Sequence, residues 1–198
     1  MRVIAGSAKG TQLNSVKGIK TRPIQDRIKA SLFNILSGVI PDSRVLDLFA
    51  GTGAIGIEAL SRGAKSCIFI DNNTSAVQII KKNLEATRLL NKAQVIKYDV
   101  FEIIPYFEKN NMQFDLVLAS PPYPFVEENS YRNRLLILFS SLCSDRTIQP
   151  EGIMMMQHRK TAFEIPPEAF YLELFDTRIY GDTQLSFFKT TMKQDDSP

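Results

Sequence analysis

Two stretches of the chain combine residue types and spacings that could do chemistry. The first, VLDLFAGTGAIG at residues 45–56, places three glycines in the pattern GxGxxG between an apolar run and a helical pattern. Such a loop lets the backbone pass close to a bound ligand. The second, ASPPYPF at residues 119–125, follows the apolar run FDLVLA. Adjacent prolines cannot continue a strand, because neither has a backbone N–H to donate, so this stretch is either a stiff turn or part of a site.

The glycine loop by itself fits two kinds of ligand. A dinucleotide fingerprint needs three glycines and an acid about twenty residues on, and the chain supplies Gly51, Gly53, Gly56 and Asp71. Asp47, which ends the strand before the loop, argues against this ligand, because its carboxylate would repel a pyrophosphate and attract a cation. S-adenosylmethionine carries a cationic sulfonium group, so we prefer it to NAD, which nothing else in the sequence supports.

The elements that must position these stretches alternate between strand and helix. Short apolar or β-branched runs predict strands at residues 44–49, 67–71, 93–98, 114–119, 152–157, 171–180 and 184–189. Helical patterns lie between most of them, at residues 53–62, 74–90, 100–110 and 130–143. This alternation predicts an α/β, Rossmann-like fold with a seven-stranded, mostly parallel sheet. The last two strands are joined only by GDT, so we expect them to pair as a hairpin that makes one strand antiparallel.

The beginning of the chain does not fit this alternation. RVIAGSAKGTQL offers two short strands around a Ser/Gly/Lys turn, so we predict a small basic ribbon at residues 1–20, packed on the main domain. The run TRPIQDRIKASLFNILSG then predicts a helix, because apolar residues recur at helical spacing until Gly38 and Pro41. We expect the main domain at residues 21–190 and a flexible tail at residues 191–198.

Basic residues gather in the same part of the chain. Residues 1–34 contain seven basic side chains and one acid, a surplus of six, whereas the whole chain has a net charge of +3, so the remainder carries −3. A basic arm on a slightly acidic body suggests a polyanionic partner, most simply nucleic acid. A solvated surface arm is the alternative.

Other residues that could carry chemistry receive plainer interpretations. Cys67 and Cys143 lie in apolar contexts without metal-ligand spacing, so we expect buried thiols in a reducing cytoplasm and no metal. His158, in QHRK, follows a predicted strand and is interpreted as a surface loop residue. Met154–Met156 is most simply buried strand. No run resembles a signal peptide or a membrane span, so a cytoplasmic location is expected.

Four segments in order, DLFAGTG, FIDNN, KYDVFE and SPPY, resemble the motifs of class I S-adenosylmethionine-dependent methyltransferases that modify exocyclic amino groups. By this resemblance Asp71 holds the ribose hydroxyls, Asp99 meets the adenine amino group, and the backbone N–H of Val100 meets the adenine ring. Each acid could instead be a helix N-cap. The implied cofactor-binding residues are Asn34, Asp47, Phe49, Gly51, Gly53, Asp71, Asn72, Asp99 and Val100.

The same resemblance gives the proline stretch a catalytic role. The amino group of a base is a poor nucleophile, because its lone pair is delocalised into the ring. In this motif the side chain of Ser120 and the carbonyl of Pro121 accept its two hydrogens and aim the lone pair at the methyl group. The prolines fix the carbonyl direction rigidly, and an aromatic ring stacks on the extruded base for about 1–3 kcal/mol. The implied catalytic residues are Ser120, Pro121, Pro122 and Tyr123, and no metal is required.

Longer segments narrow the resemblance. MRVIAG, TRPIQDRIKASLFNIL, VLDLFAGTGAIGIEALSRGA and RIYGDTQLSFFK together are similar to the RsmD-type family of bacterial 16S ribosomal RNA guanine-N2 methyltransferases, over residues 1–190. The resemblance implies S-adenosylmethionine as cofactor and ribosomal RNA or the small ribosomal subunit as partner. It places Arg22, Phe33 and Asn34 near the cofactor or target. It also implies that the ribbon grips RNA, through Lys9, Lys17, Lys20 and Arg22.

One residue departs from the family pattern, which ends this strand with an acid, as DPPY. Ser120 can still accept a hydrogen bond, but it is shorter and uncharged, so it stabilises positive charge on the nitrogen less. Three functions therefore stay open. They are methyl transfer to guanine N2 of 16S ribosomal RNA, transfer to another amino group in DNA or RNA, and RNA binding by a protein with weakened catalysis.

Overall fold

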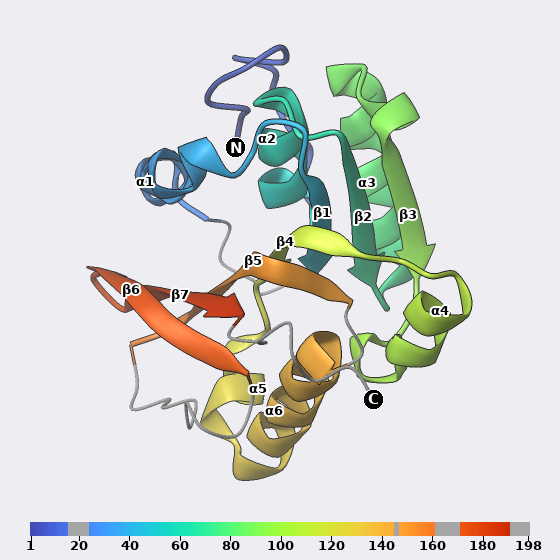
Figure 1. Cartoon of the computed structure of the whole chain (residues 1–198). Helices are drawn as coiled ribbons and strands as arrows, with labels where there is room; N and C mark the ends of the chain where they lie inside the picture. The colour runs from blue at the N-terminus through green and yellow to red at the C-terminus, as the bar shows by residue number, and fades with distance from the viewer. Residues whose placement is uncertain (16–23, 145–146, 161–170, 191–198) are drawn as a thin grey trace. The chain divides into compact units, whose positions relative to one another are not determined.

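The computed structural model describes residues 1–15, 24–144, 147–160 and 171–190 (Figure 1). The chain separates into two compact units, residues 1–100 and residues 101–198. The predicted domain boundaries at residues 20 and 190 lie within, or directly beside, stretches outside the described residues, so they stay predictions. None of the helices in the described ranges is long and apolar enough to cross a membrane.

The first unit holds three parallel strands in the order β3-β2-β1. The strands are β1 (Arg44–Leu48), β2 (Ser66–Asp71) and β3 (Ala93–Lys97). The helices are α1 (Asp26–Ile35), α2 (Ala54–Ser61) and α3 (Thr74–Thr87), with short 3-10 helices η1 (Leu36–Gly38) and η2 (Leu90–Lys92). Because α2 and α3 connect successive parallel strands, the three carboxyl ends meet at one edge.

The second unit holds four strands in the order β4-β5-β7-β6. They are β4 (Phe114–Ala119), β5 (Ile148–Arg159), β6 (Leu172–Tyr180) and β7 (Thr183–Thr190). Its helices are α4 (Ile104–Lys109), α5 (Tyr123–Glu127) and α6 (Asn129–Ser144), and η3 (Val100–Glu102) begins at the junction with the first unit. β4 and β5 are parallel, whereas β7 is antiparallel to both β5 and β6.

This architecture confirms the predicted fold class, an α/β fold with a seven-stranded sheet that is mostly parallel and has one antiparallel strand, β7. The β6–β7 hairpin turns at GDT as expected. Several elements differ from the prediction, among them the helix expected at residues 100–110, which is the 3-10 helix η3 followed by the shorter α4. β5 is twelve residues long and continues through His158 to Arg159. The five-residue helix α5 was not predicted, because prolines stand in and before its first turn, where they are tolerated but do not indicate a helix.

Buried apolar side chains are concentrated in β1, β4, β5 and β7, whereas β3 has no buried residue. In β1 the four residues after Arg44 are all buried, and the predicted buried strand Met154–Met156 is confirmed. Both cysteines are confirmed as buried, free thiols, and burial raises the pKa of Cys143 to about 12. The interpretation of His158 as a surface residue is wrong. It is fully buried in β5, where Nε2 lies 3.0 Å from Ser186 Oγ.

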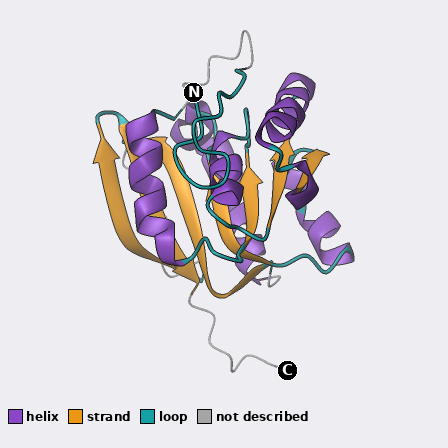
Figure 2. Cartoon of the chain, turned by 90° about the horizontal axis from the view of Figure 1, so that it is seen from above, coloured by secondary structure: helices purple, strands orange, loops and turns teal. Residues whose placement is uncertain are grey.

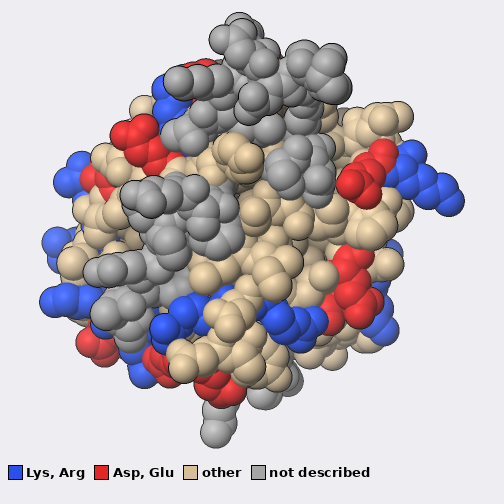
Figure 3. All heavy atoms as spheres, turned by 60° about the horizontal axis from the view of Figure 1, so that its bottom comes forward, with Lys and Arg blue, Asp and Glu red and all other residues tan. Residues whose placement is uncertain are grey.

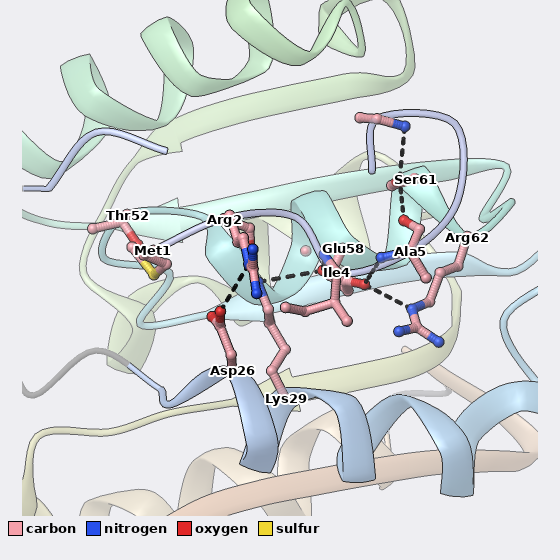
Figure 4. Close-up of polar contacts among 12 residues, drawn as sticks. Met1, Arg2, Ile4, Ala5, Asp26, Lys29, Thr52, Glu58, Ser61 and Arg62 are labelled. Carbon is pink, nitrogen blue, oxygen red and sulfur yellow. Dashed lines mark hydrogen bonds and ion pairs between the residues drawn. The ribbon is translucent and has the colours of Figure 1, made fainter. Parts of the chain in front are cut away.

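The first fifteen residues are loop rather than two regular strands, as Figure 2 shows beside the N label. One antiparallel bridge joins Arg2 to Gln12. The loop is fastened to α2 by Glu58, whose carboxylate accepts hydrogen bonds from the backbone N–H groups of Ile4 (2.8 Å) and Ala5 (3.0 Å) (Figure 4). The beginning of the chain is therefore held against the helix that follows the glycine loop.

Candidate active site

The glycine loop between β1 and α2 is built from left-handed backbone. Phe49, Gly51 and Gly53 have φ values of 58°, 58° and 74°. Glycine adopts this region freely, whereas a residue such as Phe49 is held there only when its surroundings require it. Gly53 is the N-cap of α2, so the backbone N–H groups of the first helical turn, which have no acceptor within the helix, lie next to the loop. The strain at Phe49 marks this loop as a candidate ligand site.

Gly56, the third glycine of the pattern, serves packing. A Cβ atom at this position would lie 2.4 Å from Phe69 Cε1 and 2.8 Å from Cys67 Sγ, which is closer than real contacts allow. Only glycine therefore lets α2 pack so tightly on β2. This is the helix–strand role that the pattern needs from its last glycine.

Asp47 is buried beneath the loop. Its Oδ2 accepts a hydrogen bond from the backbone N–H of Gly56 at 3.0 Å, and burial raises the pKa of its carboxyl group to about 8. At pH 7 this carboxyl is therefore mostly protonated, so it fastens the start of α2 rather than presenting a permanent negative charge. Its predicted contact with a cofactor stays a prediction.

Asp71 ties the end of β2 to the glycine loop. Its Oδ2 accepts from the backbone N–H of Gly51 at 2.8 Å, and its Oδ1 accepts from the N–H of Asn73 at 2.9 Å. Burial raises the pKa of this carboxyl group. A carboxylate has about four acceptor positions, so both oxygens can accept further hydrogen bonds. The structure thus brings two predicted cofactor residues, Asp71 and Gly51, into direct contact.

The other predicted cofactor residues of this unit occupy more varied positions. Asn72 is exposed directly after β2, whereas its neighbour Asn73, which the sequence analysis did not single out, caps α3 by accepting from the N–H groups of Ser75 and Ala76. Asp99 is half-buried and Val100 is buried where η3 begins.

On α1, Asn34 is exposed and Phe33 points into the interior. The guanidinium of Arg62 lies 5.0 Å from the centre of the Phe33 ring. Packing therefore accounts for Phe33, and the predicted proximity of this residue to the cofactor or target stays a prediction.

The proline stretch ends β4 and begins α5. Pro122 is the N-cap of α5 and Pro124 stands in its first turn, where a missing N–H costs nothing. Ser120 is the first residue after β4, and its Oγ is buried with no hydrogen-bond partner among the described residues. Buried hydroxyl groups are normally paired. A polar ligand would give this one the partner it lacks.

Tyr123 is in contact with a residue that the sequence analysis did not assign to the site. The guanidinium of Arg159, at the end of β5, lies 5.0 Å from the centre of the Tyr123 ring. Arg159 also forms an ion pair with Glu127 of α5 at 2.9 Å. No sequence signal beyond the basic run HRK could have found this contact, because the two residues are 36 positions apart.

Comparison with known proteins places these features in a family. The family model described as "Conserved hypothetical protein 95" matches residues 1–189. The chain belongs to this family. The predicted similarity to the RsmD-type methyltransferase family is confirmed, and so is the methyltransferase fold.

Several relatives of this chain are named as ribosomal RNA methyltransferases. The "Putative rRNA methyltransferase YlbH" of Bacillus subtilis is 34% identical over 189 residues, which cover 96% of this chain and 98% of the relative. The "Ribosomal RNA small subunit methyltransferase D" of Haemophilus influenzae is 32% identical, over 87% of this chain and 86% of its own length. The solved structure "Putative methyltransferase yhhF from Escherichia coli" superposes with a TM-score of 0.78 at 26% identity, covering 98% and 99%. The enzyme class of this family member is therefore methyltransferase.

The residues of this family member fit S-adenosylmethionine. The loop that follows β1 is strained and rich in glycine, and the carboxylate of Asp71 lies against it with acceptor positions to spare. Asp99 follows β3 at the same edge of the first unit. Among the described residues, no cluster of three or more His, Cys, Asp or Glu side chains could hold a metal ion.

The predicted RNA-binding residues are only partly described. Lys9 is exposed in the N-terminal loop, whereas Lys17, Lys20 and Arg22 lie outside the described residues. On the face drawn in Figure 3, basic and acidic side chains are interspersed. RNA binding by the arm stays a prediction.

Proposed function

We propose that this protein transfers a methyl group from S-adenosylmethionine to the exocyclic N2 amino group of a guanine in 16S ribosomal RNA. The observation that carries the proposal is the buried hydroxyl of Ser120, which lacks a partner among the described residues and begins the SPPY motif after β4. Membership of a family with relatives named as ribosomal RNA methyltransferases supports the substrate class. The partner would be the RNA or the small ribosomal subunit, and methyl transfer would take place in the cytoplasm.

The first unit would hold the cofactor, which supplies an electrophilic methyl group on a sulfonium sulfur. Asp71 would accept hydrogen bonds from the ribose hydroxyls while it keeps the N–H of Gly51 in place. Asp99 and the N–H of Val100 would meet the adenine. Phe49, Gly51 and Gly53 would shape the loop, with Asp47 fastened beneath it and Asn34 and Asn72 at its margins.

The second unit would hold the target base. Ser120 Oγ and the carbonyl oxygen of Pro121 would accept the two hydrogens of the amino group, which turns the nitrogen lone pair toward the methyl group. Pro122 fixes the direction of that carbonyl, because it cannot leave the N-cap conformation easily. Tyr123 would stack on the extruded base. Holding the reactants in line supplies most of the rate enhancement.

The basic segment at the beginning of the chain would contact phosphates. Lys9 is exposed on a loop that Glu58 fastens to α2, and Lys17, Lys20 and Arg22 follow in the sequence. We retain residues 1–20 as an RNA-binding arm, residues 21–190 as the methyltransferase domain and residues 191–198 as a tail.

Transfer of labelled methyl groups tests the proposal. Small ribosomal subunits and bare 16S RNA from cells that lack this enzyme are incubated with tritiated S-adenosylmethionine, and the modified base is mapped. We expect one methylated guanine, at N2. Label on an adenine or cytosine, or on DNA, would favour the second function. Binding of RNA and cofactor without transfer would favour a protein whose catalysis is disabled by Ser120 in place of the family's acid.

A further inference from the structure

Two buried side-chain oxygens of the second unit lack a hydrogen-bond partner among the described residues. They are Ser120 Oγ and Gln157 Oε1. The function proposed above uses the hydroxyl of Ser120 but leaves the amide of Gln157 without a role. A buried carbonyl oxygen that accepts no hydrogen bond lowers stability. The three residues before Gln157 on β5 are methionines, and another apolar side chain there would avoid this loss.

The strand register places the two residues at matching positions of neighbouring strands. β4 and β5 are parallel, and Ala119 is paired with Met156. Ser120 and Gln157 are the next residue on each chain, beyond the same end of the ladder. Neighbouring strands lie about 4.8 Å apart, and residues at matching positions point to the same face. The carboxyl ends of β4 and β5 therefore present two adjacent acceptors.

The face of β5 that carries Gln157 is the one that meets Tyr123. Residues two apart on a strand share a face, and β5 keeps regular pairing with β7 from Gln157 to Arg159. Arg159 lies 5.0 Å from the centre of the Tyr123 ring. His158 points to the opposite face and is paired with Ser186. Gln157 thus belongs to the same surface as the predicted catalytic residues.

We propose that Gln157 Oε1 accepts a hydrogen bond from the Watson–Crick edge of the base whose amino group is methylated, and so selects guanine. This inference rests on the proposed function. Enzymes that extrude a base recognise it by hydrogen bonds to this edge. Guanine presents the N1–H donor directly beside its amino group, whereas adenine and cytosine present an acceptor nitrogen there. Two adjacent acceptors, Ser120 Oγ for the amino group and Gln157 Oε1 for N1–H, match guanine alone.

Three variants test the role of Gln157. Gln157→Met has a similar volume but no acceptor, Gln157→Glu keeps an acceptor, and Gln113→Met changes a glutamine just before β4 as the matched control. Single-turnover methyl transfer to small subunits is measured at saturating cofactor, together with the melting temperature of each protein. The melting temperature separates a ligand contact from ordinary packing. Replacing a buried polar group that has no hydrogen-bond partner raises stability, whereas replacing a side chain that stabilises the fold lowers it.

We expect Gln157→Met to slow transfer roughly 10- to 100-fold while its melting temperature rises by about 2–4 °C. Gln157→Glu should lose less activity, and Gln113→Met should match the parent in both measurements. A Gln157→Met protein with the parent rate, or with an unchanged or lower melting temperature, would overturn the inference. If the parent itself transfers no methyl, the proposed function is wrong. The inference, which rests on that function, is then overturned with it, whatever the melting temperature of Gln157→Met.

Discussion

Asp47 is a single buried carboxyl group that is hydrogen-bonded to the start of α2, beneath the glycine loop. The side chain is 2% exposed and its only described hydrogen-bond donor is the backbone N–H of Gly56. Burial raises the pKa of this group to about 8, against an ordinary value of 3.8. The proton that it keeps makes its burial tolerable, and the loss of that proton should weaken the fold.

The stability of the protein should therefore fall as pH rises through the range between these two pKa values. Between about pH 4 and pH 8 the folded state holds a proton on Asp47 that the unfolded state has released, so stability is highest at the acid end and is lost toward pH 8. The slope from one such group approaches about 1.4 kcal/mol per pH unit. Asp47→Asn keeps an acceptor for Gly56 but cannot ionise. Urea unfolding from pH 5 to pH 8 should show a flatter profile for the variant, and parallel profiles would contradict the assignment.

Asp71 makes a different prediction, for ligand affinity. Asp71→Ala removes the predicted ribose acceptor and also frees the N–H of Gly51. Hydrogen bonds to a charged acceptor contribute about 1.5–3 kcal/mol, so affinity for S-adenosylmethionine should fall roughly 10- to 150-fold. Asp71→Asn keeps an oxygen for Gly51 and should lose less. Calorimetric titration measures both, with Glu85→Ala on the exposed side of α3 as control. Unchanged affinity in a folded Asp71→Ala protein would remove Asp71 from the site.

Substitutions at Ser120 and Tyr123 test the chemistry directly. Ser120→Ala should slow methyl transfer by roughly 10- to 100-fold, or about 1.4–2.7 kcal/mol of barrier, because one acceptor of the amino group is lost. Ser120→Asp should match or exceed the parent, because a carboxylate stabilises the growing positive charge on nitrogen. Tyr123→Ala should lose more than Tyr123→Phe, which keeps the stacking face. Single-turnover rates decide, and a full rate in Ser120→Ala would leave the orientation to Pro121 alone.

At the scale of elements, the sequence predicted the strands and long helices well, because their apolar periodicity is strong. It missed features that depend on packing between segments. The α5 helix is too short for a periodic pattern and begins with prolines. His158 follows the predicted strand at residues 152–157 in a polar run that resembles a loop, yet pairing with β7 continues through it to Arg159. The unpaired oxygen of Gln157 follows from burial in three dimensions, which no local pattern encodes.

The anchoring of the N-terminal loop to α2 is another feature that only the structure reveals. Glu58 is fully buried and accepts from Ile4, Ala5, Lys29 and Arg62 (Figure 4). Lys29 Nζ lies 3.3 Å from its carboxylate and also donates to the carbonyl of Arg2 at 2.5 Å. Burial lowers the pKa of Lys29, and the charge of Glu58 opposes that effect. Removing one partner of such a fully buried ion pair lowers stability, because the other charge stays buried without a counter-charge.

We expect Glu58→Gln to lower the free energy of unfolding by about 3–5 kcal/mol, because it leaves the ammonium of Lys29 buried without its counter-charge. The double variant Lys29→Met with Glu58→Gln should recover part of the loss, since the introduced amide would still accept from the backbone and the buried ammonium would be gone. Urea denaturation of the parent, both single variants and the double variant measures this coupling. Strictly additive losses would show that the two side chains do not act as a pair.

At the scale of the whole molecule, the predicted cofactor residues lie in the first unit and the predicted catalytic residues in the second. In the proposed reaction, the first unit would supply the contacts to the cofactor and the second the contacts to the target base. Charge is also unevenly distributed along the chain, with a net charge of +6 in residues 1–34 and of −3 over the remainder. The basic residues Lys9, Lys17 and Lys20 should act on RNA binding without acting on the cofactor.

Neutralising the arm tests this separation. Replacement of Lys9, Lys17, Lys20 and Arg22 by Gln should weaken RNA binding and reduce its dependence on salt, because fewer counterions are released from the phosphates. Each lost phosphate contact should lower the slope of log affinity against log salt by about 0.7–0.9. Affinity for S-adenosylmethionine should change little, except through Arg22. Lys81→Gln with Lys82→Gln, on the exposed side of α3, serves as the control and should keep the parent slope. If the arm variant also keeps the parent slope, the basic segment is ordinary solvated surface and the RNA contacts lie elsewhere on the molecule.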